Sequence, residues 1–147
     1  MTEEQCTIIL LEFLEEHNWD ILCFDFPQSG TGKVLHPANS SSKTEGSIIP
    51  DIVAVKKGVC LYFENKDHYF LPDFEKVNML RTTTDYHKAI NELTKGKGVQ
   101  KVYYGIGFPT SCSPRVNNED KEKVDFIVTV DNDKTVDVFY DTFGLVF

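Results

Sequence analysis

The stretch SIIPDIVAVKKGVCLYFENK, residues 47–66, decides the fold of this chain. Ser47–Val55 and Val59–Lys66 are rich in Ile, Val, Phe and Tyr, which is typical of strands, and Lys57-Gly58 between them predicts a two-residue hairpin turn. A hairpin closed at this turn places Asp51 directly opposite Glu64. Because side chains alternate between the two faces of a strand, Glu64 and Lys66 share the face that Asp51 occupies.

Two carboxylates that face each other across a hairpin repel, and this repulsion destabilises an ordinary sheet. A divalent cation between Asp51 and Glu64 removes the repulsion, since Mg²⁺ binds carboxylate oxygens, main-chain carbonyls and water in octahedral geometry. The hairpin therefore predicts a cation site. The alternative is an exposed edge hairpin whose Asp, Glu and Lys are ordinary surface residues.

The arrangement of Pro50-Asp51 followed by Glu64-Asn65-Lys66 resembles the motif of the PD-(D/E)XK nuclease superfamily, which includes type II restriction endonucleases and archaeal Holliday junction resolvases. The resemblance implies an α/β fold with a restriction-endonuclease-like mixed β-sheet core flanked by helices. It also implies that Asp51, Glu64 and the main-chain carbonyl of Asn65 bind Mg²⁺, with Mn²⁺ as an alternative cation. Lys66 would orient the attacking water or help to deprotonate it.

A first helix is predicted from Thr2, which is suited to the N-cap, to about His17. Its apolar stripe runs through Ile8 and Leu11 and leads back to Glu4. Members of the superfamily often present a glutamate from the N-terminal helix beside the metal, and Glu4 is the position that best matches this role. The alternative is that Glu4 only stabilises the positive end of the helix dipole.

The rest of the chain completes an α/β pattern. A strand is expected over Trp19–Phe26. It is followed, after the hairpin, by a helix that Asp73 caps and that extends to about Thr94, with a weak point at Thr82-Thr83-Thr84. The remaining elements are a central strand over Lys101–Phe108, a polar loop over 109–122, and a closing hairpin of Val124–Val130 and Thr135–Tyr140. A polar loop of roughly twenty residues precedes the 47–66 stretch. This loop either contacts DNA through Lys33, His36, Asn39 and Lys43 or is a mobile excursion.

The composition fits one nuclease-like domain over residues 1–147, because 147 residues with 41% hydrophobic side chains suffice for one core. No apolar run approaches the ~20 residues that cross a membrane, so we expect a cytoplasmic protein without a membrane partner. The net charge of −8 argues against a protein that coats nucleic acid nonspecifically. A site-specific nuclease needs only a local basic surface, for which the candidates are Lys33, Lys43, Lys95, Lys97 and Lys101.

These observations predict a Mg²⁺-dependent DNA endonuclease of the restriction type. By analogy with small nucleases it would act as a homodimer, with the apolar residues 143–147 as an interface patch. Two alternatives stay open: a structure-selective Holliday junction resolvase, for which the chain is rather acidic, and a catalytically silent nuclease-fold module that binds a partner.

Overall fold

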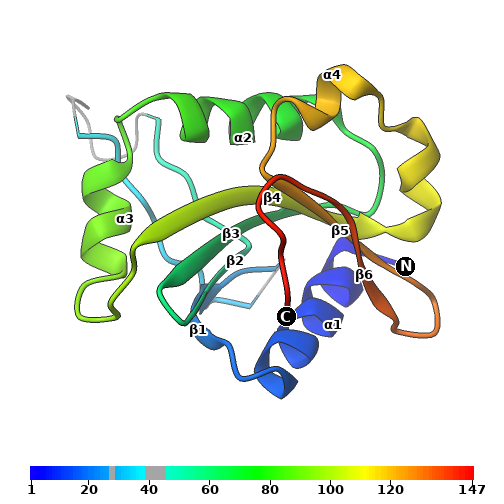
Figure 1. Cartoon of the computed structure of the whole chain (residues 1–147), viewed down its shortest axis with the longest axis horizontal. Helices are drawn as coiled ribbons and strands as arrows, with labels where there is room; N and C mark the ends of the chain where they lie inside the picture. Colours follow the sequence, from blue (N-terminus) through cyan, green and yellow to red (C-terminus); the bar gives the residue numbers. More distant parts are fainter. Residues whose placement is uncertain (27–28, 39–45) are drawn as a thin grey trace.

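Six strands form one mixed sheet in the order β1-β2-β3-β4-β5-β6 in the computed structural model, which describes residues 1–26, 29–38 and 46–147 (Figure 1). The strands are β1 (Asp20–Phe24), β2 (Ile52–Lys56), β3 (Val59–Asn65), β4 (Lys101–Pro109), β5 (Phe126–Val130) and β6 (Val136–Asp141). Strands β3, β4 and β5 run parallel, and the other neighbours pair antiparallel. The predicted mixed α/β class with helices around a sheet is confirmed.

The hairpin of β2 and β3 has the predicted register. Ile52 pairs with Phe63 and Lys56 pairs with Val59 across the turn. Lys57 and Gly58 have φ angles of 49° and 82°, the left-handed values that two-residue hairpin turns require. The register continues one residue beyond β2, where the amide of Asp51 donates to the carbonyl of Phe63 at 3.2 Å, so that Asp51 comes to lie beside Glu64.

The helices are α1 (Glu3–Glu16), α2 (Leu71–Thr82), α3 (His87–Leu93), the 3₁₀ helix η1 (Thr110–Arg115) and α4 (Asn118–Lys121). Thr2 caps α1 in a capping box with Gln5, as its sequence predicts. The helix expected up to Thr94 is interrupted after Thr82, where three β-branched threonines follow one another.

Two predictions about local structure were wrong. Asp73 does not cap α2, because the helix already begins at Leu71 and Pro72 occupies its first turn, a position where a missing N–H costs nothing. The segment 109–122, expected as a loop, contains η1 and α4, and the latter is held by a capping box of Asn117 and Asp120.

Helices cover both faces of the sheet: α1 lies on one face, and α2 and α3 lie on the other (Figure 1). Strand alternation divides the core between the two layers. Leu61 and Phe63 of β3 pack in the cluster that includes α1, whereas Cys60 and Tyr62 pack in the cluster that includes α2. Continuing this alternation, Glu64 faces α2 and Asn65 faces α1.

The apolar C-terminal residues pack against the sheet and α1 of their own chain. The ring of Phe143 stacks on Tyr103 with centroids 3.6 Å apart, and the ring of Phe147 meets Phe13 at 5.0 Å. Leu145 is buried, whereas Val146 is 81% exposed. The segment predicted as an interface patch therefore serves mainly to close the core. None of the helices in the described residues is long and apolar enough to cross a bilayer.

Candidate functional site

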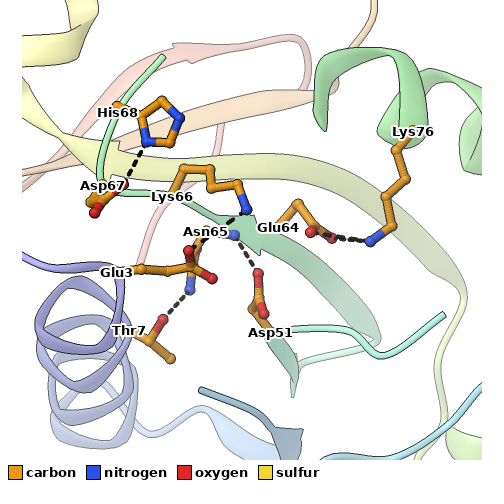
Figure 2. Close-up of polar contacts among 9 residues, drawn as sticks. All are labelled: Glu3, Thr7, Asp51, Glu64, Asn65, Lys66, Asp67, His68 and Lys76. Atoms are coloured by element: carbon orange, nitrogen blue, oxygen red, sulfur yellow. Dashed lines mark hydrogen bonds and ion pairs between the residues drawn. The ribbon is translucent and has the colours of Figure 1, made fainter. Parts of the chain in front are cut away.

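Asp51 and Glu64 meet at the end of β3, beneath the first turns of α2 (Figure 2). This is the carboxyl edge of the parallel strands β3 and β4, the edge at which open α/β sheets commonly bind ligands. Both carboxylates are nearly inaccessible, with 8% of Asp51 and 7% of Glu64 exposed. The side chains are therefore not those of an exposed edge hairpin, which was the alternative interpretation of the sequence.

Asp51 is fixed by the backbone of the opposite strand. Its Oδ2 accepts a hydrogen bond of 2.7 Å from the amide of Asn65. Burial and, to a smaller extent, the negative charge of Glu64 raise the pKa of Asp51 to about 8, although the hydrogen bond from Asn65 opposes the shift. Among the described residues no ammonium forms an ion pair with Asp51, although the charge of Lys76 acts weakly to lower its pKa.

Glu64 has a lysine as its partner. The Nζ of Lys76, from α2, lies 3.1 Å from each of the two carboxylate oxygens (Figure 2). Burial raises the pKa of Glu64, and the ammonium of Lys76 works in the opposite direction. Lys76 had no role in the sequence prediction, because its approach to Glu64 depends on how α2 docks on the sheet.

Lys66 follows β3 and is surrounded by carboxylates. Its Nζ lies 3.6 Å from Oε2 of Glu3 and 5.4 Å from the ring centroid of Phe70. Burial would lower the pKa of Lys66, but the carboxylates of Asp73, Glu3, Glu64 and Asp51 together raise it. Lys66 is thus held as an ammonium, a form that stabilises negative charge and does not remove a proton.

The N-terminal helix contributes Glu3 where the sequence predicted Glu4. Glu4 is exposed, whereas Glu3 is half-buried and pairs with Lys66. One residue along a helix turns a side chain by about 100°, so a one-position difference moves the carboxylate to another face. The residue that borders the site from α1 is therefore Glu3.

Asn65 connects the site to α1 through its side chain. Its Nδ2 donates to Oγ1 of Thr7 at 3.1 Å, and both residues are fully buried (Figure 2). Gly107 of β4 lies next to this contact, where a Cβ would come within 2.4 Å of Oδ1 of Asn65 and 2.8 Å of Leu10. Gly107 thus allows close packing of α1, and the end of β3 is held between two helices.

Asp73 is a buried carboxylate that the sequence reasoning treated only as a helix cap. It is 7% exposed, and its Oδ2 has no hydrogen-bond partner among the described residues. Burial raises the pKa of Asp73, while the positive charges of Lys66 and Lys76 oppose this shift. The signal in the sequence that could have pointed to Asp73 as a site residue was the pair Pro72-Asp73, and a helix-capping role explained this pair equally well.

The side chains suit a divalent cation in part. Asp51 and Glu64 offer hard oxygen ligands on one face, and burial raises the pKa of each carboxyl, a penalty on the ionised forms that a bound cation would offset. Against this, Lys76 already contacts both oxygens of Glu64. Within the described part of the chain, no group of three or more His, Cys, Asp or Glu side chains has the arrangement of a metal centre.

His68, two residues beyond Lys66, is exposed and pairs with Asp67 at 2.6 Å.

The predicted DNA contacts lie away from the site. Lys101 pairs in register with Val59 at the start of β3, about 20 Å from the site, because a seven-residue strand rises ~3.3 Å per residue. Lys97, which bonds Asp20 at 3.0 Å, and Lys95 precede Lys101. Lys33 and His36 line a cavity of about 500 Å³ against α3, and Asn39 and Lys43 fall outside the described residues.

Comparison with known proteins gives no relative: no family model, no curated protein and no solved structure matches this chain. The relationship to PD-(D/E)XK nucleases therefore stays a prediction, and the function has to be argued from the side chains at the end of β3.

Proposed function

We propose that the protein is a Mg²⁺-dependent DNA endonuclease with a restriction-endonuclease-like core and that Asp51, Glu64 and Lys66 form its active site. The observation that carries the proposal is the burial of two facing carboxylates, Asp51 and Glu64, with the ammonium of Lys66 two residues beyond Glu64. Folding alone does not favour this arrangement, because like charges opposite each other destabilise a sheet.

Each residue has a defined part in phosphodiester hydrolysis. Asp51 and Glu64 would hold the cation, together with the main-chain carbonyl of Asn65. When bound, Mg²⁺ or Mn²⁺ supplies a Lewis acid for the phosphoryl oxygen and lowers the pKa of a nearby water. The carboxylates around Lys66 keep this side chain protonated, so that its ammonium can stabilise the charge that develops on the phosphate.

Electrostatics limit how this site would bind DNA. The chain carries a net charge of −8, and the predicted lysines at 95, 97 and 101 lie at the other end of the sheet. Lys66 and Lys76 are the lysines that contact carboxylates of the site. Binding of DNA would then depend strongly on the bound cation, which offsets the repulsion between carboxylates and phosphates.

One observation favours a second candidate, a silent member of the nuclease fold that binds a partner. The contact of Lys76 with both oxygens of Glu64 neutralises one carboxylate without any metal. Such a pair is a sufficient structural partner for a buried glutamate. Among the described residues no ammonium forms a comparable pair with Asp51, which is why we prefer the endonuclease.

Cleavage assays separate these candidates. Linear, supercoiled and four-way-junction DNA and single-stranded RNA are incubated with Mg²⁺, Mn²⁺ or EDTA. We expect metal-dependent cleavage of DNA that Asp51→Ala and Lys66→Ala each reduce by at least about a hundredfold. Lys97→Ala, at the far end of the sheet, serves as the control and should cleave like the wild type.

The pattern of cleavage assigns the class. Preference for the junction over linear duplex would indicate a resolvase, and preference for RNA would change the substrate. Absence of cleavage on every substrate, or cleavage that persists in both site variants, would overturn the endonuclease proposal in favour of the binding module.

A further inference from the structure

Lys76 contacts the buried carboxylate of Glu64 and lies three residues along α2 from a second buried carboxylate, Asp73. Its Nζ is 3.1 Å from each oxygen of Glu64, so it occupies the space in front of this carboxylate (Figure 2). A magnesium ion would need to approach the same oxygens to about 2.0–2.1 Å. An ammonium and a divalent cation cannot both take this position.

Asp73 offers Lys76 a second partner. The two residues are three positions apart on α2, a spacing that makes side chains neighbours on one side of a helix. Asp73 is more than nine-tenths buried, and its Oδ2 lacks a hydrogen-bond partner among the described residues. A buried carboxylate oxygen without a partner is costly, so its retention calls for an explanation.

We propose that Lys76 is a tethered cation that blocks Glu64 until a divalent cation binds, and that it then moves from Glu64 to Asp73. The inference rests on the proposed function, because it assumes that Asp51 and Glu64 are the cation ligands. Lys76 is in this account a positioning residue: it keeps the two carboxylates in place without metal and sets how tightly the metal binds.

The movement is compatible with the geometry of a lysine side chain. Lys76 is half-buried and has four rotatable bonds, and it stands in the first half of α2, close to Asp73. Displacement from Glu64 without a new partner would cost the energy of one ion pair. The oxygen of Asp73 compensates this loss, so Asp73 should promote metal binding without touching the metal.

A double-mutant cycle tests the proposal through metal affinity, measured by Mn²⁺ titration with electron paramagnetic resonance at about pH 8.5. The proteins are the wild type, Lys76→Met, Asp73→Asn and the double variant. We expect Lys76→Met to bind Mn²⁺ roughly tenfold more tightly, and Asp73→Asn to bind it several-fold more weakly. In the Lys76→Met background, Asp73→Asn should have little further effect.

Two controls distinguish the effect of the direct contact between Lys76 and Glu64 from the effect of positive charge near the site. Lys66→Met removes the same charge near the site but leaves Lys76 on Glu64, so its gain in affinity should be clearly smaller than that of Lys76→Met. Glu64→Gln should abolish the binding. Circular dichroism verifies that each variant is folded, and Lys76→Gln replaces Lys76→Met if the latter is not.

The outcomes are distinguishable. Equal or weaker binding by folded Lys76→Met and Lys76→Gln, with binding by the wild type intact, overturns the inference and leaves the metal site standing. A loss of affinity from Asp73→Asn that persists without Lys76 means that Asp73 acts on the cation itself and also overturns the inference. Absence of Mn²⁺ binding in every protein overturns both the inference and the proposed function.

Discussion

In the absence of a cation, ionised Asp51 lowers the free energy of unfolding, and the size of this effect depends on pH. Burial and the charge of Glu64 raise its pKa to about 8, whereas an unfolded chain has a pKa of about 3.9 at this residue. The folded state therefore binds the proton more tightly than the unfolded state between these values. The stability that protonated Asp51 contributes is fully present below about pH 4 and is lost as the pH rises through 8.

We expect Asp51→Asn to be more stable than the wild type at pH 8 without metal, by about 1–3 kcal/mol, because the amide removes a buried charge that has no ion-pair partner in the described part of the chain. At pH 5 the difference should be clearly smaller, since Asp51 is then protonated in the folded state and only the ionisation of the unfolded chain still opposes folding. Urea unfolding of both proteins at the two pH values measures the difference. A difference of the same size at both values would contradict the assigned pKa.

Glu3 and Lys76 illustrate what local sequence patterns leave open at the scale of single residues. The hairpin residues Asp51 and Glu64 could be predicted as neighbours, because the turn Lys57-Gly58 fixes the register of two adjacent strands. Lys76 reaches Glu64 only through the docking of α2, and Glu3 rather than Glu4 borders the site because of the rotation of α1. Neither the docking of α2 nor the rotation of α1 can be deduced from the residues next to the contact.

At the scale of the elements, β3 couples the two helical layers. Its last two residues point to opposite faces, with Glu64 bound to Lys76 of α2 and Asn65 bound to Thr7 of α1. A change in the position of either helix would therefore move the end of β3 and, with it, the carboxylate pair. The buried hydrogen bond of Asn65 is the contact that fixes α1 here.

We expect Thr7→Val to lower the free energy of unfolding by about 1–3 kcal/mol, because the fully buried amide of Asn65 loses its acceptor. Thr7→Ser keeps the hydroxyl and should cost less, which makes it the matched control. Chemical denaturation of the three proteins measures both values. Equal losses in the two variants would show that the methyl group of Thr7, and not the hydrogen bond, is what matters.

Most helices and strands could be predicted from the sequence, but some of the positions where they begin or end could not. Helix α1 and the strands followed from capping residues and from runs of β-branched side chains. The break after Thr82 was visible as a weak point, whereas the start of α2 three residues earlier than expected was not. That shift carried Asp73 from the cap into the first turn, where it is buried beside the site.

At the scale of the whole molecule, the C-terminal segment closes the layer formed by α1 and the sheet. The sequence suggested an exposed apolar patch, because residues 143–147 are nearly all apolar. Apolar composition alone does not tell whether such a segment packs on its own core or on a partner. In the folded chain Phe143 and Leu145 are turned inward, and the side chain that remains largely exposed is Val146.

Leu145→Ala should therefore destabilise the protein by about 2–3 kcal/mol, as expected for removing most of a buried leucine side chain. Val146→Ala, one residue further on, should change the stability by less than about 0.5 kcal/mol. Thermal unfolding of both variants gives the comparison. If Val146→Ala were the more damaging change, or if either variant altered the oligomeric state, the segment would be an interface and not part of the core.

The measurement that tests the central claim most directly is the rate of Mg²⁺-dependent DNA cleavage by the wild type and by Asp51→Asn. This variant replaces one oxygen of a cation ligand and is expected to fold at least as stably as the wild type, so a loss of rate cannot be ascribed to unfolding. We predict cleavage by the wild type and a loss of at least about a hundredfold in the variant. Equal rates, or no cleavage by either folded protein, would contradict it.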